Sequence, residues 1–273
     1  TRYQGLLQYR YKTNALEKLP SAHENPIINN IAQTADGKIW VNSFAGGIYQ
    51  LRNDSLVRGN TEFAKLGATS LIAVNNQLWA GCLNEIVVFD ERAIRKRISL
   101  SPYYEYLSNA TRAQSLHIDA EGHLWIGTER DGVIVLDTAT HQLVRRFSPK
   151  QKPFYSSVLR INEDDHKLVW MLTESNGLIV YSRTEDKFLH LFHQKQEAGS
   201  LSSDHCTSIC IDKSGIVWVG SGGPLNKYDR EKIKFQHIKY EPGNPLSLSD
   251  DNTRGIYEDV GGLIYVATSD GYL

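Results

Sequence analysis

The 273-residue sequence lacks several features that would place it in a simple class. No stretch of about 18 apolar residues is present, so no helix is expected to cross a membrane. There is also no basic segment followed by an apolar run, the pattern typical of a secretory signal peptide. Lys and Arg number 30 against 31 Asp and Glu. Because the charges balance, the chain has no excess field to hold a nucleic acid or an anionic bilayer.

Cysteine is scarce and does not suggest a disulfide framework. The three cysteines are Cys82, Cys206 and Cys210, and none forms a Cys-x-x-Cys pair. Cys206 and Cys210 fall four residues apart in a predicted strand, about 13 Å by strand geometry, which is too far for a disulfide. We expect all three to be small buried hydrophobic residues, and they leave the redox compartment open.

Aromatic residues, by contrast, are plentiful and regularly spaced. Apolar residues make up 41% of the chain, which is enough for a full core and argues against a disordered chain. The five tryptophans and one tyrosine share one phase of a repeat, with successive spacings of 39, 46, 45, 48 and 47 residues. These aromatic residues are Trp40, Trp79, Trp125, Trp170, Trp218 and Tyr265.

The third repeat shows the local pattern most clearly. An aliphatic residue, an aspartate and a glycine stand nine, six and three residues before the aromatic, and a small residue stands three after it: Leu116, Asp119, Gly122, Trp125 and Thr128. The apolar runs at 115–118, 124–128, 133–136 and 142–147 have no helical period and are separated by turn residues. Each repeat therefore predicts four short strands.

Four strands repeated about every 45 residues predict an all-β fold, a β-propeller of four-stranded antiparallel blades. Six repeats are visible, at roughly 21–59, 60–100, 110–148, 155–193, 203–240 and 250–273. We expect the repeated aromatic residues to form the structural core between neighbouring blades. The prediction treats 1–273 as a propeller fragment.

The two ends of the chain suggest a piece of a longer array. Residues 1–20 match the third and fourth strands of a repeat, so we expect them to supply outer strands of a blade. Residues 271–273 duplicate the register of residues 5–7, and the chain starts at Thr1 without a methionine. We therefore expect a mature product or an excised piece, and a seven-bladed or tandem propeller stays open.

The repeat phrase resembles a known family. Residues 115–128 (SLHIDAEGHLWIGT) and 208–221 (SICIDKSGIVWVGS) are similar to the two-component regulator propeller repeat, as are the connectors at 199–203 and 243–249. The shortened second repeat departs from the pattern, and Lys167 replaces a glycine in the fourth. The resemblance covers nearly the whole chain.

This resemblance implies the periplasmic sensor region of a Bacteroidetes hybrid two-component system. Such regions usually carry a second propeller, a small β-sandwich and a transmembrane helix before a cytoplasmic histidine kinase, and we expect the parent protein to be a homodimer. Many detect oligosaccharides and switch on glycan-utilisation genes. The resemblance implies no catalysis, cofactor or metal in this region.

A ligand would bind the face that holds the turns between second and third strands and the connectors between blades. Aromatic rings stack on sugar C–H surfaces, while Arg, Asp and Asn bind hydroxyl or acidic groups. Strand starts near the central channel add polar residues, Asn29 and Gln114 among them. The candidate ligand-binding residues are Phe44, Tyr103, Tyr104, Arg112, Glu129, Arg130, Arg160, Glu174, Asn176, His205 and Arg254.

Two other functional classes stay open. A protein-binding scaffold propeller would expose a continuous apolar patch. A propeller lyase or hydrolase, like the streptogramin lyases with their similar repeat, would need a His and Glu pair with a metal near the channel. The histidines are dispersed, and only His205 is expected on that face. The fold alone does not choose between these roles.

Overall fold

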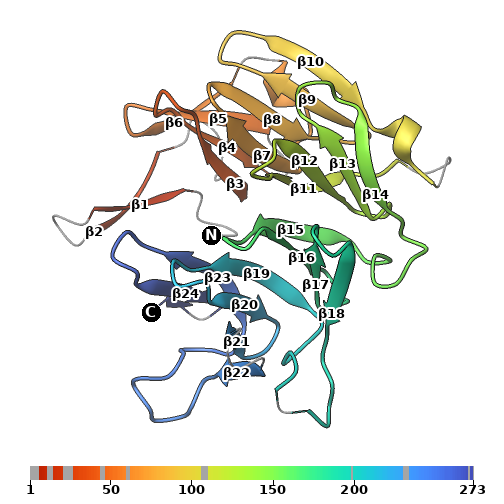
Figure 1. Cartoon of the computed structure of the whole chain (residues 1–273). Helices are drawn as coiled ribbons and strands as arrows, with labels where there is room; N and C mark the ends of the chain where they lie inside the picture. Colours follow the sequence, from red (N-terminus) through yellow and green to blue (C-terminus); the bar gives the residue numbers. More distant parts are fainter. Residues whose placement is uncertain are drawn as a thin grey trace.

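The computed structural model describes residues 6–10, 15–20, 27–43, 47–59, 62–105, 110–197, 199–229, 234–269 and 271–272. Its sheets follow one another around a central axis, in chain order from β3 to β24 (Figure 1). In these ranges the regular elements are strands and two short 3₁₀ helices, η1 (Phe63–Lys65) and η2 (Ser101–Tyr103), with no α-helix. No helix in the described ranges is long and apolar enough to span a bilayer.

Five sheets are complete antiparallel blades, in which the innermost strand comes first in the chain and the outermost last. Blade 1 contains β3 (Ile28–Gln33), β4 (Ile39–Ser43), β5 (Gly47–Arg52) and β6 (Ser55–Arg58). Blade 2 contains β7 (Ser70–Val74), β8 (Gln77–Gly81), β9 (Glu85–Phe89) and β10 (Ile94–Ser99). Blade 3 contains β11 (Ala113–Ile118), β12 (His123–Thr128), β13 (Val133–Asp137) and β14 (Leu143–Phe147). Blade 4 contains β15 (Val158–Glu163), β16 (Leu168–Thr173), β17 (Leu178–Ser182) and β18 (Lys187–Leu191). Blade 5 contains β19 (Cys206–Ile211), β20 (Val217–Ser221), β21 (Leu225–Asp229) and β22 (Lys234–Ile238).

The propeller and its four-stranded blades are confirmed, but the prediction of six such blades is wrong. The sixth repeat forms a three-stranded sheet of β23 (Thr253–Glu258), β24 (Ile264–Thr268) and β25 (Gly271–Tyr272). Its residues suffice for three strands, so the described chain contains five complete blades.

The first two strands form a separate sheet. β1 (Leu7–Arg10) pairs with β2 (Ala15–Lys18), and neither joins β24 or β25. In Figure 1 this hairpin lies between blade 1 and the β23–β25 sheet. The preceding Leu6 packs against Val41, Tyr49 and Leu56, and the Pro20 carbonyl accepts a hydrogen bond from Leu56 N at 2.8 Å. The amino-terminal strands are thus attached to blade 1.

The repeated aromatic residue of each blade packs against the next blade along the chain. Trp125 of blade 3, for example, lies in a cluster with Ile161, Met171 and Tyr181 of blade 4. Trp40, Trp79, Trp125 and Trp170 are all buried, with exposures of 1–5%. Burial of this much apolar surface between sheets is a main source of stability in such a fold.

The last two repeats differ, and the expected core position is wrong for Tyr265. Trp218 is half-buried, because the sheet that covers it has only three strands. Tyr265 belongs to that last sheet and is 39% exposed, beside Tyr257 at 59%. The physical reason is that, in the described part of the chain, no blade packs on the outward face of this sheet.

The repeated aspartate has a structural role that the sequence pattern alone did not explain. Asp119 Oδ2 accepts a hydrogen bond from Trp125 Nε1 at 2.7 Å, while Oδ1 accepts from the backbone N–H groups of Glu121 and His123 at 2.9 Å. Asp164 and Asp212 bind the indoles of Trp170 and Trp218 in the same way, also at 2.7 Å. One side chain thus closes the turn and fixes the buried ring.

Two repeats depart from this pattern, the second in its aspartate and the fourth in its turn glycine. The second repeat has a shorter turn without the aspartate, and Trp79 Nε1 is buried without a hydrogen-bond partner in the described structure. In the fourth repeat Lys167 takes the place of the turn glycine and adopts its left-handed conformation, with φ 61° against 83° for Gly122. The turn geometry is therefore retained where its glycine is not.

Near the central channel, neighbouring blades approach so closely that glycine is required. Gly127 lies two residues after Trp125, and Ser115 Oγ donates a hydrogen bond across to Val158 O of the next blade at 2.8 Å. A Cβ atom at Gly127 would meet Ser115 Oγ and would come within 2.8 Å of Val158 O. Gly81 and Gly220 occupy equivalent crowded positions.

We expect Gly127→Ala to lower the free energy of unfolding by about 1–3 kcal/mol, because the added methyl group forces two blades apart. Chemical denaturation would measure the change. Gly222→Ala is the matched control, since nothing lies within 4 Å of a Cβ there. Equal effects at the two glycines would show that the close approach of the blades does not limit stability.

Candidate functional site

A β-bulge recurs at one end of the innermost strands. The pairing register shifts by one residue in each such strand except β7. A bulge inserts an extra residue and redirects side chains, and bulges are common beside functional sites. The shifts lie between Ile28 and Asn30, Ala113 and Ser115, Val158 and Arg160, Cys206 and Ser208, and Thr253 and Gly255.

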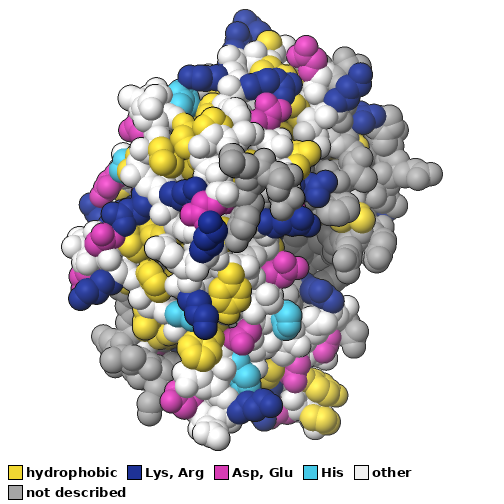
Figure 2. Space-filling model, turned by 90° about the vertical axis from the view of Figure 1, so that its right-hand side faces the viewer, with side chains coloured by type: hydrophobic (Ala, Val, Ile, Leu, Met, Phe, Trp, Pro, Cys, Tyr) yellow, Lys and Arg dark blue, Asp and Glu magenta, His cyan; other side chains and the backbone are white. Residues whose placement is uncertain are grey.

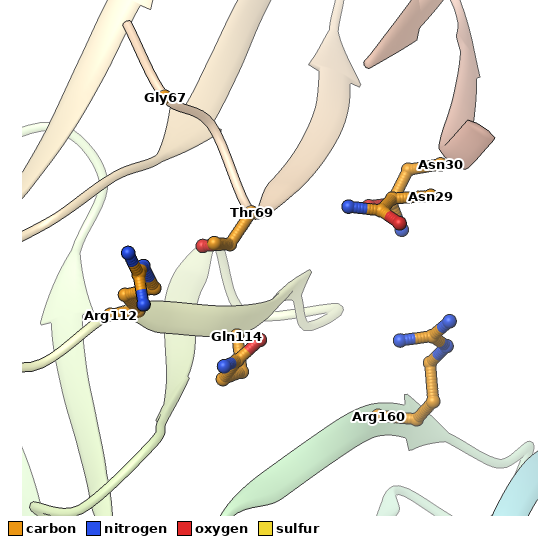
Figure 3. Close-up of a pocket in the computed structure, with 7 residues that line it drawn as sticks. All are labelled: Asn29, Asn30, Gly67, Thr69, Arg112, Gln114 and Arg160. Atoms are coloured by element: carbon orange, nitrogen blue, oxygen red, sulfur yellow. The ribbon is translucent and has the colours of Figure 1, made fainter. Parts of the chain in front are cut away.

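The bulged ends of blades 1, 3 and 4, with the connector to blade 2, surround a cavity of about 350 Å³. Pockets for small ligands start at about this size, roughly 300 Å³. Figure 3 shows Arg112 with Thr69 and Gln114 on one side, and Arg160 reaching from β15 toward Asn29 and Asn30 on the other. The lining residues are Asn29, Asn30, Gly67, Thr69, Arg112, Gln114 and Arg160.

The cavity is polar and carries positive charge. Two arginines line it, and no Asp or Glu is among its described lining residues. Arg160 Nη1 donates a hydrogen bond to the adjacent Leu159 carbonyl at 2.7 Å, which leaves its other donors for a ligand. Arg160 is exposed to the channel, where loss of surrounding water lowers its pKa, but a guanidinium stays protonated at any physiological pH.

The structure brings together only part of the predicted ligand surface. Arg112 and Arg160 both line the cavity, with Asn29 and Gln114. Arg254 is exposed, but its Nε donates to Ser269 Oγ at 3.0 Å and it is not among the lining residues. Phe44 lies outside the described residues.

The two connector tyrosines pack into the fold, and neither is among the residues that line the cavity. Tyr104 is only 8% exposed and belongs to the hydrophobic cluster between blades 2 and 3, where burial raises the pKa of its hydroxyl. Tyr103 packs against the same cluster, and its hydroxyl donates to His141 O at 3.5 Å. Removing the apolar surface of these rings from water stabilises the folded state.

The remaining candidates occupy the surrounding turns. Asn176 is buried and structural, because its amide donates to Pro153 O at 2.6 Å and accepts from the Tyr155 hydroxyl at 2.7 Å. His205 Nδ1 lies 3.1 Å from the Glu174 carbonyl oxygen, and both residues are exposed.

Glu129 and Arg130 form an ion pair at 3.8 Å in the turn between β12 and β13. Neither residue is among those that line the cavity. Glu129 N donates to the Arg112 carbonyl at 2.9 Å, so this turn holds the backbone of one cavity arginine.

Asn30 and Thr69 line the cavity but were not predicted. Both stand at the start of an innermost strand, Asn30 after the bulge of β3 and Thr69 immediately before β7. Thr69 Oγ1 donates to Ala113 O at 2.8 Å, which ties this side of the cavity to blade 3. The Asn29-Asn30 pair inside an otherwise apolar strand start was the sequence signal for this part of the site.

Two observations bear on the alternative classes, a search for metal-ligand groups and the exposed apolar side chains. In the described ranges, no group of three or more His, Cys, Asp or Glu is placed to hold a metal ion. Figure 2 shows small groups of apolar side chains separated by charged ones on the face it presents. Exposed apolar residues on the outer strands of blades 3 and 4 are Leu143, Val144, Phe188 and Leu189.

Comparison with solved structures places the fold among known propellers. The extracellular domain of a putative hybrid two component system from B. thetaiotaomicron matches with a TM-score of 0.57 and 20% identity, over 97% of this chain and 41% of that chain. A virginiamycin B lyase from Staphylococcus aureus matches at 0.60 and 13% identity, over 88% and 76%. The WD40 propeller domain of Doa1 matches at 0.69 and 9% identity, over 99% and 85%.

These likenesses establish the fold, and the chain spans about two fifths of the length of the B. thetaiotaomicron extracellular domains that it matches. No curated protein matches the chain significantly. The family model described as "Two component regulator propeller" matches residues 106–130 and 200–223. These segments contain both phrases, 115–128 and 208–221, that carry the resemblance. The chain is thus a β-propeller, and two of its segments match the two-component regulator propeller model.

Proposed function

We propose that this chain is a ligand-sensing propeller of a hybrid two-component system and that it detects an oligosaccharide at the channel cavity. The observation that carries the proposal is the set of amide, hydroxyl and guanidinium groups that converge from different blades on one cavity. Sugars present many hydroxyl groups, and such side chains both donate and accept hydrogen bonds. The family match and the likeness to two-component extracellular domains support the sensor role.

Signalling would follow from a shift between arrangements of the parent protein. A ligand changes an equilibrium only by the difference between its affinities for the two states. In this proposal the sugar favours one arrangement of this propeller with a second propeller and a β-sandwich of the same chain, in a periplasmic homodimer. That arrangement controls a cytoplasmic histidine kinase and, through it, glycan-utilisation genes. The propeller itself catalyses no reaction.

The test is calorimetric titration of the chain with a panel of oligosaccharides from defined polysaccharides. We expect one stoichiometric ligand, and we expect the double variant Asn30→Ala with Gln114→Ala to weaken its binding at least tenfold, since each lost hydrogen bond costs about 1 kcal/mol. Gln151→Ala, an exposed residue outside the cavity, is the control. An affinity unchanged in the cavity variant would place the site elsewhere. No binding of any oligosaccharide in the panel would contradict the proposal.

A protein-binding scaffold is the second candidate. The observation that favours it is the exposure of Leu143, Val144, Phe188 and Leu189, at 44–53%, on the outer strands β14 and β18. Outer strands present unpaired backbone groups that a partner strand can use. If the scaffold role is correct, replacing Val144 and Leu189 with lysine abolishes capture of the partner while cavity variants leave it intact.

A further inference from the structure

We infer that the channel cavity selects an acidic oligosaccharide and that Arg112 and Arg160 bind its carboxylate or sulfate group. This inference rests on the proposed sugar-binding function of the same cavity and adds the chemical class of the ligand. Its basis is the positive charge of the cavity. A site for a neutral sugar needs only amide and hydroxyl groups, whereas this cavity also contains two arginines.

The first argument is that, among the described residues, neither cavity arginine has an acidic partner. The described ion pairs engage many of the chain's other arginines, such as Arg97 with Glu85 and Arg146 with Asp131. No ion pair of the described residues involves Arg112 or Arg160, and the hydrogen bond from the Arg160 side chain goes to the neighbouring Leu159 carbonyl. Two unneutralised guanidinium groups around one cavity disfavour each other and favour an anion between them.

The second argument is the chemistry of the donors. A guanidinium presents paired N–H groups in a plane, which match the two oxygens of a carboxylate or sulfate. The amides of Asn29, Asn30 and Gln114 line the same cavity and suit the neutral hydroxyl groups of the same sugar. A neutral sugar would use the amides but would leave both positive charges uncompensated.

The third argument is that Glu129, whose backbone is bonded to that of Arg112, pairs with another arginine. Glu129 N donates a hydrogen bond to the Arg112 carbonyl, while the Glu129 carboxylate lies 3.8 Å from Arg130 Nη2. The turn therefore supports the Arg112 backbone without neutralising its side chain. The positive potential of the cavity is retained.

The experiment compares trigalacturonate with galactotriose, which share ring number and hydroxyl pattern but differ in charge, and adds sulfated chondroitin disaccharides as the sulfate arm. We expect the chain to bind at least one acidic ligand at least tenfold more tightly than its neutral counterpart. Arg112→Ala and Arg160→Ala should each weaken that binding about tenfold to a hundredfold, as loss of charged hydrogen bonds does. Raising the salt from about 10 to 150 mM should weaken it several-fold, since the screening length falls from about 30 to 8 Å.

The controls separate charge from folding and from the proposed function. Arg92→Ala removes an exposed arginine outside the cavity and should leave binding unchanged. Arg160→Lys retains the charge but not the paired donors, and unchanged melting temperatures show that each variant folds. Equal binding of neutral and acidic sugars, unaffected by Arg112→Ala and Arg160→Ala, would overturn the acidic ligand while leaving the sugar sensor intact. Cavity-dependent binding of free sulfate without any sugar would overturn the sugar sensor and retain the anion site.

Discussion

Replacing Trp125 with alanine is expected to lower the free energy of unfolding by about 3–5 kcal/mol, the range for large aromatic truncations in cores. The ring is 2% exposed and packs against blade 4, where it lies 5.9 Å from the Tyr181 ring. The substitution also removes the indole N–H that Asp119 accepts at 2.7 Å, which leaves a buried carboxylate oxygen with one donor fewer. Denaturant titration followed by circular dichroism would measure the loss.

The matched control is the same repeat position in the last sheet. Tyr265→Ala should lower stability by less than about 1 kcal/mol, because the ring is 39% exposed and its hydroxyl is 3.3 Å from Asp259 Oδ2 on an exposed turn. Equal losses at Trp125 and Tyr265 would show that burial against the following blade is not what makes the aromatic residue important.

Arg183→Ala is expected to cost about 3–5 kcal/mol, because removing one partner of a buried ion pair leaves the others uncompensated. Arg183 lies in the turn between β17 and β18 of blade 4 and is 14% exposed. Its guanidinium contacts Asp119 Oδ2 of blade 3 at 2.5 Å and also contacts Glu163. The side chain of Asp119 is fully buried, so this arginine joins two blades at the aspartate that holds Trp125.

The pH dependence of the same variant follows from Asp119. Burial raises its pKa, but the hydrogen bonds from Trp125 and His123 N and the charge of Arg183 together bring the pKa below the usual 3.8. A carboxylate with a lowered pKa stabilises the fold above about pH 3.8, and this stabilisation is lost as the pH falls through the folded-state pKa. Without Arg183 that pKa rises, so acid unfolding should begin at a higher pH.

Arg95→Ala serves as the control for an ion pair at the surface. Arg95 contacts Asp90 at 2.6 Å but is 47% exposed, so its loss should cost no more than about 1 kcal/mol. If Arg183→Ala were as mild as Arg95→Ala, or left acid unfolding unchanged, the contact between blades 3 and 4 would not contribute as described.

The repeat period predicted the architecture because each of the first four blades buries its aromatic residue against the next sheet. The repeat period did not give the number of complete blades. Strand pairing at the two ends of the chain depends on local contacts, such as those of the β1–β2 hairpin, that the period does not describe. The period also did not give the role of Asp119, because a spacing of six residues says nothing about an indole hydrogen bond across a turn. Tyr265 matched the pattern yet lies exposed, because burial depends on a neighbouring blade rather than on its own repeat.

The candidate site was predictable only where side chains stand at strand starts. Arg112, Arg160 and Gln114 line the cavity because the innermost strands all begin around the channel. The burial of Tyr104 was not predicted, because a connector is not always a surface loop and its ring fills a space between two blades. Asn30 and Thr69 required the bulge and the register of individual strands, which the sequence does not specify.

The most direct test of the account is a crystal structure of the chain with an acidic oligosaccharide that binds it in solution. The account predicts a sugar at the channel cavity, with its carboxylate or sulfate within hydrogen-bonding distance of Arg112 or Arg160 and its hydroxyl groups on Asn29, Asn30 or Gln114. A sugar bound on the outer strands β14 and β18, or with its acidic group turned away from both arginines, would contradict it.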